Sequence, residues 1–214
     1  MFDRLAFRLT GLLFLSCASL PVLAQQFSAD MVHLKPQNAV VTKVFVSGDK
    51  MRFEVTGQAR SSVVIMNLAQ RTSLMLIPDT KTYIVSPPGR TPAAMPFFHP
   101  ADADNGCEAW EKSVDKPGTC TKVGDEKING RSTVKYKGAA QNGDTGYAWV
   151  DRNLKFVIKW EGEKTAAEFQ NLHEGPQTAS LFEVPGGYEK FDLAKEQKAA
   201  KGRAKAKPKV APQR

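Results

Sequence analysis

The sequence has few of the residues on which catalysis most often depends. It contains three histidines, His33, His99 and His173, far apart in the chain, and neither a Gly-x-Ser-x-Gly elbow nor a His-Glu-x-x-His helix. Residues 102–106 hold two aspartates, but they lack the third ligand and the glutamate that a calcium loop requires. We therefore expect a protein that is not an enzyme and that has no cofactor and no metal site.

Long apolar runs are also scarce. The N-terminal run, residues 9–15, follows Arg4 and Arg8 and precedes small residues that end at Ala24. This order is typical of a secretory signal peptide, so residues 1–24 are predicted to be removed after Ala24. No segment approaches the ~20 apolar residues of a transmembrane helix. The mature chain is expected to be a soluble protein of the periplasm.

Cysteine occurs three times, as Cys17, Cys107 and Cys120. One alternative makes Cys17 the lipidated residue of a lipoprotein, although Phe14 and Leu15 suit that cleavage poorly. If Cys17 leaves with the signal peptide, the other two remain, and two cysteines in an oxidising compartment normally form a disulfide. A redox pair would favour closer spacing, and no histidine lies near enough in sequence to suggest zinc. Such a disulfide contributes about 3 kcal/mol in the chain-entropy description.

Charge is distributed unevenly along the chain. Residues 25–194 hold 20 basic and 20 acidic side chains, whereas residues 195–214 hold eight basic residues and only Glu196 as an acid. These last residues therefore carry +7 of the formal net charge of +8. They include no aromatic residue and only Val210 as a β-branched one, so they cannot form a core and are expected to be disordered.

Two roles are open for this basic tail. Its side chains either contact anionic lipid headgroups or only keep the protein in solution. Nucleic acid would attract them equally well, but an exported protein seldom meets it. The residues concerned are Lys195, Lys198, Lys201, Arg203, Lys205, Lys207 and Lys209.

The body of the chain has the length of one domain, and its hydrophobic pattern is mostly of period two. Residues 47–50 carry turn residues between two alternating segments, which predicts a β-hairpin. Short connections favour antiparallel neighbours. We therefore predict a mainly β fold with minor α structure, built on a curved antiparallel sheet of eight to ten strands. The predicted strands are residues 27–33, 40–46, 51–55, 62–68, 73–77, 82–85, 133–137, 145–150, 155–160 and 164–172.

The alternating pattern breaks between residues 86 and 121. Five prolines exclude a long helix before Ala101. Residues 103–112 can form one short helix, with Asp102 or Asp104 as its N-cap. A curved sheet must cover its inner face, and this insert, including residues 96–98 and the disulfide loop, is the candidate cover.

Four segments resemble the superfamily of the outer-membrane lipoprotein carrier LolA. Residues 44–54 (VFVSGDKMRFE) are similar to its strand–turn–strand. Residues 124–136, which contain GDEKING and TVKY, are similar to its strand entry. The hairpin at 147–160, with YAWVD and FVIKW, and the closing turn LFEVPGGY at 181–188 follow in the same order. The resemblance covers residues 27–192 and points to a branch other than LolA itself.

This resemblance implies a half-barrel domain over residues 25–194, in which an antiparallel sheet surrounds an apolar cavity covered by helices. It also implies lipid or lipoprotein acyl chains as partners. Two features depart from the LolA pattern. Only Gln25 and Gln26 precede the first strand, where LolA has a helix, and Gly48-Asp49 replaces an arginine followed by proline at the cavity mouth.

The apolar residues of the predicted strands are the candidate ligand contacts. The simpler interpretation is that they fill the core, as in most small barrels; flexible methionines favour an adaptable surface. The candidate residues are Met51, Phe53, Val55, Val64, Met66, Leu74, Leu76, Phe156, Ile158 and Trp160.

Two functional hypotheses follow from these observations. The first is a periplasmic, non-enzymatic carrier or chaperone for lipid or lipidated protein. The second is an envelope sensor or protein-interaction domain with the same scaffold, a filled core and no lipid ligand. The sequence does not specify an oligomeric state.

Overall fold

The computed structural model describes residues 25–55, 61–86, 99–113, 117–141 and 143–191. The predicted signal peptide with Cys17, the basic tail at 195–214 and residues 96–98 of the predicted cover lie outside the described residues. Within the described part, no helix is both long enough and apolar enough to cross a membrane.

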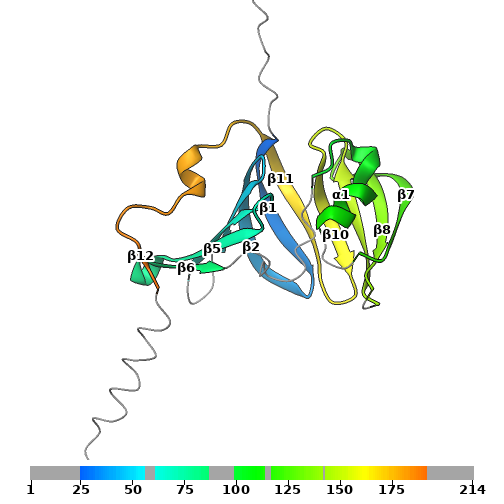
Figure 1. Cartoon of the computed structure of the whole chain (residues 1–214). Coiled ribbons are helices and arrows are strands. Elements are labelled where there is room, and N and C mark those ends of the chain that lie inside the picture. The colour runs from blue at the N-terminus through cyan, green and yellow to red at the C-terminus, as the bar shows by residue number, and fades with distance from the viewer. Residues whose placement is uncertain (1–24, 56–60, 87–98, 114–116, 142, 192–214) are drawn as a thin grey trace, which may run out of the picture.

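Twelve strands form one curved, open sheet (Figure 1). Their order across the sheet is β12-β6-β5-β4-β3-β2-β1-β11-β10-β9-β8-β7. The strands are β1 (Gln26–Lys35), β2 (Gln37–Ser47), β3 (Lys50–Val55), β4 (Ser62–Asn67), β5 (Thr72–Ile77), β6 (Thr82–Ser86), β7 (Thr119–Ile128), β8 (Arg131–Ala139), β9 (Thr145–Asp151), β10 (Phe156–Gly162), β11 (Ala166–Glu174) and β12 (Glu189–Lys190). One α-helix, α1 (Gly106–Ser113), and three 3₁₀ turns, η1 (Pro78–Thr80), η2 (Ala103–Asn105) and η3 (Ala179–Phe182), complete the described elements.

The sheet consists of two antiparallel meanders, β1–β6 and β7–β11, joined where β1 pairs with β11. It curls strongly at the second meander. A flat sheet would hold β8 and β11 three strand spacings apart, about 14 Å. Instead Asn129, in the β7–β8 turn, donates from its short side chain to the carbonyl oxygen of Phe169 on β11 at 3.3 Å. Nearby, Arg131 on β8 contacts Glu174 on β11 at 2.6 Å.

The mainly β fold and the curved antiparallel sheet are confirmed, and the sheet has two strands more than the sequence predicted. Strand β7 carries mostly exposed polar residues and has no alternating pattern, because it is an edge strand with one neighbour, β8. Strand β12 has only two residues and pairs in parallel with β6. Neither strand has the periodicity by which a half-buried strand is recognised.

The main core lies between the central strands, where three phenylalanine rings meet. The ring of Phe27 lies 5.3 Å from that of Phe156 and 6.1 Å from that of Phe169, between ring centroids. All three side chains are buried. Trp160 packs edge-on against Phe169, with ring centroids 6.5 Å apart. Strands from both meanders thus share one apolar core.

Residues 175–191 form a C-terminal strap over the first meander. Phe182 in η3 is buried against Ile65 on β4 and Leu76 on β5. Arg52 on β3 donates from its guanidinium to the carbonyl oxygen of Leu181 at 2.8 Å. The strap covers one face of β4 and β5 and ends as β12 beside β6 (Figure 1).

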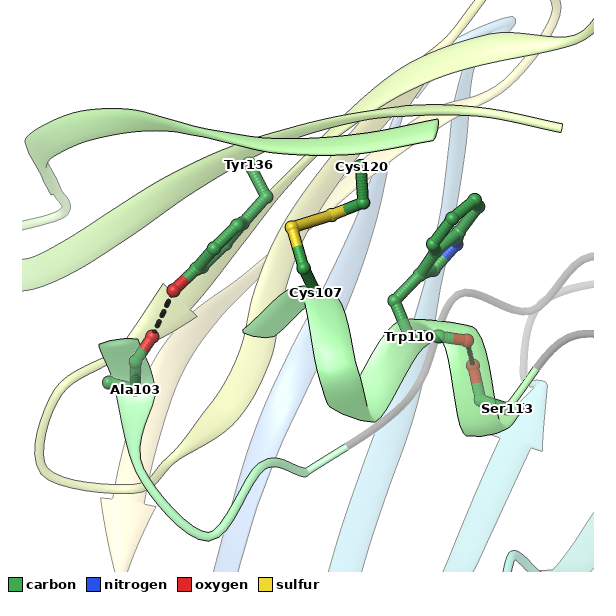
Figure 2. Close-up of a disulfide and its surroundings, with 6 residues drawn as sticks. All are labelled: Ala103, Cys107, Trp110, Ser113, Cys120 and Tyr136. Atoms are coloured by element: carbon green, nitrogen blue, oxygen red, sulfur yellow. Dashed lines mark hydrogen bonds between the residues drawn. A yellow bond between two sulfur atoms is a disulfide. The ribbon is translucent and has the colours of Figure 1, made fainter. Parts of the chain in front are cut away.

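Helix α1 is fastened to β7 and β8 on the second meander (Figure 2). The predicted disulfide is confirmed, because Cys107 in α1 is bonded to Cys120 on β7. Tyr136 on β8 donates to the carbonyl oxygen of Ala103 at 2.6 Å. Its ring lies so close to Gly106 that a Cβ atom there would come within 2.5 Å of it. A side chain at position 106 would therefore push the helix away from the sheet.

The helix predicted over residues 103–112 forms in two parts, since residues 103–105 are the 3₁₀ turn η2 and α1 begins at Gly106. Asp102 caps η2, because its carboxylate accepts from the backbone N–H of Asp104 at 2.9 Å. Asp104 itself forms ion pairs with Arg152 at 3.0 Å and with Lys122. The hydrogen bonds from Arg152 and then Lys122 lower the pKa of Asp104 to about 2. The Asp104 carboxylate thus joins the start of the helix segment to β7 and to the β9–β10 turn.

Neutralising Asp104 should change acid stability. Because the folded-state pKa lies below the ordinary 3.8, the contribution of this carboxylate is present above pH ~4 and is lost as the pH falls toward about 2. Acid unfolding followed by circular dichroism should show Asp104→Asn less stable than wild type at pH 5 and equal to it near pH 2. Asp79→Asn, in exposed η1, controls for the loss of one carboxylate. A difference that persists unchanged to pH 2 would contradict the assignment.

Candidate functional site

One row of apolar side chains crosses five strands of the first meander. Each residue lies directly opposite the next, and the row runs Val44, Phe53, Val64, Met75, Ile84 from β2 to β6. Directly opposed residues in antiparallel strands share one face of the sheet, so these five side chains form a continuous surface. We call this set the apolar row.

The exposed fraction of the side chains rises along the apolar row from Val44 to Met75. Val44 is fully buried and Phe53 is 2% exposed, whereas Met75 is 43% exposed. Val64 and Ile84 have intermediate exposure. The strap covers the opposite face of these strands, since its contacts are the alternate residues of β4 and β5. The row therefore begins in the core and ends as an open apolar surface on β5 and β6.

A second row of side chains lies beside the apolar row on the same face, and it is polar where it reaches β5 and β6. It runs from Val46 through Met51 and Met66, and then continues with Ser73 and Ser86 on β5 and β6. The open part of the apolar surface is thus bordered by hydroxyl groups on this side. A narrow apolar strip with a hydroxyl border suits a thin, flexible apolar chain better than a flat hydrophobic partner.

The structure divides the predicted ligand-contact residues between two clusters. Met51, Phe53, Met66, Phe156, Ile158 and Trp160 belong to the main core cluster, and Val64 packs against it. Val55 is half-buried and lies in register with Thr42 and Ser62. Leu74 and Leu76 are on the opposite face, where they pack with Phe182 of the strap. Those two leucines therefore cannot share a surface with the other eight.

The main-core residues are packed rather than open. Met51 and Phe156 have no exposed area, Ile158 is 1% exposed and Trp160 is 9% exposed. Phe156 is also stacked on the ring of His99, with centroids 6.3 Å apart. The open apolar surface is instead made by Met75 and Ile84, which are not among the ten candidate ligand contacts. The sequence does carry a sign of this surface. In the run from Leu74 to Leu76 all three residues are apolar, so apolar side chains must point to both faces of the strand.

A polar depression of about 110 Å³ lies on the central strands. Its lining includes Asp30, Lys43, Asn171 and His173. Hydrogen bonds from Asn171 and then Lys43 lower the pKa of Asp30, which keeps its carboxylate charged and paired. The volume is below the roughly 300–1,000 Å³ of small-molecule pockets.

Two lysines surround an indole ring on β9. The Nζ atoms of Lys135 and Lys159 lie 4.7 and 4.8 Å from the ring centroid of Trp149. Its indole N–H donates to Glu126 at 3.0 Å, and this bond, followed by the one from Lys135, lowers the pKa of Glu126. Glu126 pairs with Lys135 at 3.2 Å, and Glu168 lies 4.0 Å from Lys159, so both lysine charges are compensated within the cluster. Among the described residues, no group of three or more His, Cys, Asp or Glu side chains could hold a metal ion.

No protein-family model matches the sequence, and no curated protein matches it. Solved structures are similar in fold. An uncharacterized conserved protein from Thermus thermophilus has a TM-score of 0.53 and 10% identity, over 79% of this chain and 91% of that chain. At this identity the similarity concerns the fold alone.

Two further structures have TM-scores below 0.5. MucB, in its Pseudomonas aeruginosa complex with MucA, has a TM-score of 0.45 and 16% identity, over 76% of this chain and 58% of that chain. A LolA superfamily protein from Nitrosomonas europaea has a TM-score of 0.36 and 9% identity, over 75% of this chain and 90% of that chain. The single curved, open sheet itself agrees with the curved antiparallel sheet that the sequence predicts.

Proposed function

We propose that this chain is a non-enzymatic periplasmic binding protein, a carrier or chaperone for lipid or lipidated protein, that holds an acyl chain on the outer part of the apolar row. The observation that carries the proposal is the continuous apolar surface from buried Val44 to exposed Met75. The predicted signal peptide and the disulfide between Cys107 and Cys120 support an oxidising location.

The energetics of this surface suit an acyl chain. Each methylene removed from water contributes about 0.8 kcal/mol. Met75 has an unbranched, flexible side chain that can adapt to a mobile ligand. Val64 and Ile84, the neighbours of Met75 in the row, provide contact on both sides of it. A chain that lies across these strands can then follow the row toward Phe53.

The second hypothesis, an envelope sensor or protein-interaction domain with a filled core, also has an observation in its favour. Most of the predicted ligand contacts are buried in the main core, where Phe27, Phe156 and Phe169 occupy the interior. We therefore place the acyl chain on the open end of the row and not among these rings. A partner protein could use the same open surface, so a direct lipid assay is the deciding measurement.

Charge at Met75 should weaken acyl-chain binding. The probe is a fluorescent fatty acid used below its critical micelle concentration, and the variant is Met75→Asp. A buried methionine side chain is worth about 1.5–3 kcal/mol, so we expect affinity to fall at least about tenfold. The readout is a fluorescence titration.

The matched control is Val123→Asp, because Val123 is 54% exposed on β7, at the opposite edge of the sheet. This variant should bind the probe as wild type does. Absence of binding to wild type would exclude the carrier function and favour the interaction domain. Equal affinity of wild type and Met75→Asp would exclude the apolar row as the binding surface.

A further inference from the structure

The three strands that carry the open end of the apolar row contain no charged residue. Their sequences are SVVIMN in β4, TSLMLI in β5 and TYIVS in β6, although 24% of all residues in the chain are charged. On the same face, β12 places Glu189 opposite Thr82. Helix α1 lies at the other end of the sheet, against β7 and β8 (Figure 1). The three strands thus offer a ligand no positive charge, and β12 adds a negative one on this face.

A pair of serines borders the open end. Ser73 on β5 lies directly opposite Ser86 on β6. Each is two residues from a member of the apolar row, Met75 or Ile84, and therefore shares its face. The Cβ atoms of opposed residues are about 4.5–5.5 Å apart, so both hydroxyls can reach one oxygen atom of a ligand. Ser73 is 4% exposed, and its hydroxyl forms no hydrogen bond with another described residue.

Desolvation determines which headgroup this serine pair accepts. A group that reaches the buried Ser73 hydroxyl gives up most of its water. For an ionised carboxylate, phosphate or ammonium this loss is strongly unfavourable unless an opposite charge compensates it, and β5 and β6 supply none. A neutral ester loses less hydration and regains it, because a serine hydroxyl donates a hydrogen bond to a carbonyl oxygen. The pair therefore favours an uncharged polar group.

The size of the open surface favours a small amphiphile over a protein. A stable protein interface uses about 20–30 residues a side. The open end of the apolar row has three members, Val64, Met75 and Ile84, with the serine pair at its border. The opposite face of β4 and β5 is already covered by the strap. A protein partner would therefore have to extend well beyond this patch, whereas one acyl chain with a small headgroup fits within it.

We propose that the open end of the apolar row is selective for uncharged acyl esters, the class of the monoacylglycerols. The acyl chain lies along Ile84 and Met75 toward Val64, and the hydroxyls of Ser73 and Ser86 donate to the ester carbonyl oxygen. This inference rests on the proposed function and extends it to the class of ligand. The apolar row supplies most of the affinity, and the two serines determine the specificity.

The experiment compares three amphiphiles that carry a dodecyl or dodecanoyl chain: monododecanoylglycerol, dodecanoate and dodecyltrimethylammonium. Each is used below its critical micelle concentration, in competition with the fluorescent fatty acid. The titrations are run at pH ~8, where a carboxylate is ionised, and in 1 M salt, where charges are screened beyond about 3 Å. Wild type should bind the neutral ester about tenfold more tightly than either ion, as expected for one or two additional hydrogen bonds.

Serine variants test the source of this preference. The double variant Ser73→Ala, Ser86→Ala should bind the neutral ester about tenfold more weakly and dodecanoate as wild type does. Ser132→Ala is the control, because Ser132 is exposed on β8 at the other end of the sheet. Ser86→Lys should reverse the preference in favour of dodecanoate, since it adds the missing cation. Urea unfolding of each variant shows that the fold is retained.

The possible failures are distinguishable. A preference for the neutral ester that survives unchanged in the double alanine variant would overturn the serine site. If wild type binds the three amphiphiles equally, or prefers an ion, the proposed function stands and this inference fails. If wild type binds none of them and does not bind the fluorescent fatty acid, the proposed function itself fails and the protein-interaction domain remains.

Discussion

Truncation of Phe156 to alanine should lower the free energy of unfolding by about 4 kcal/mol, since burial of this kind typically makes Phe→Ala cost 3–5 kcal/mol. The side chain has no exposed area, and its ring contacts those of Phe27, Phe169 and His99. These partners come from β1, β11 and the segment before α1, so they cannot collapse together into the space that the ring leaves.

Urea unfolding monitored by tryptophan fluorescence measures this loss. Val123→Ala is the control, because Val123 is largely exposed and its truncation should change stability by less than about 0.5 kcal/mol. The result also shows whether the interior of the main core is filled, which is the point on which the two functional hypotheses differ. A ring that lined an open cavity would have few contacts to lose, so a cost below about 1 kcal/mol would indicate an unfilled interior and return the acyl chain to this region.

The parts of this fold that were predictable from sequence are those that local chemistry determines. The hairpin of β2 and β3 has its turn residues at Gly48 and Asp49, between strands whose apolar and polar residues alternate. The structure confirms this hairpin. Helix α1 follows a cap at Asp102. Cys107 and Cys120 are the only two cysteines of the predicted mature chain, so only one disulfide was possible. Each of these features depends on residues close in sequence or on a single possible pairing.

Strand register was not predictable in the same way. Strand β5 is apolar from Leu74 to Leu76, so its pattern does not say which face meets the main core. Cross-strand pairing decides it, because Met75 lies opposite Val64 and places both leucines under the strap. The strap itself joins residues more than one hundred positions apart, as the bond between Arg52 and Leu181 illustrates. No local pattern encodes such a contact.

The same limit applies to the charged contacts that hold the curl of the second meander. Arg131 reaches Asp151 on β9 and Glu174 on β11. Asp151 is almost fully buried, and its carboxylate also accepts the backbone N–H groups of Asn153 and Leu154 at 2.9 and 2.8 Å. The hydrogen bond to Asp151 raises the pKa of Arg131, which favours the charged form of the guanidinium. In the sequence these residues are ordinary members of polar turns.

Replacement of Arg131 by methionine should therefore destabilise the protein by about 3 kcal/mol, close to the cost of breaking a buried ion pair. Methionine keeps most of the volume and removes the charge, which leaves the Asp151 carboxylate buried with only its two backbone donors. Chemical denaturation with urea measures this loss of stability.

A double-mutant cycle separates this effect from lost packing. Asp151→Asn keeps an oxygen that can accept the turn N–H groups, so the double variant Arg131→Met, Asp151→Asn buries no uncompensated charge. Its total loss should be smaller than the sum of the two single losses by 1–3 kcal/mol, as for residues in direct contact. Simple additivity would mean that Arg131 supports the curl through its contact with Glu174 alone. In that case Glu174→Gln should reproduce the loss seen in Arg131→Met.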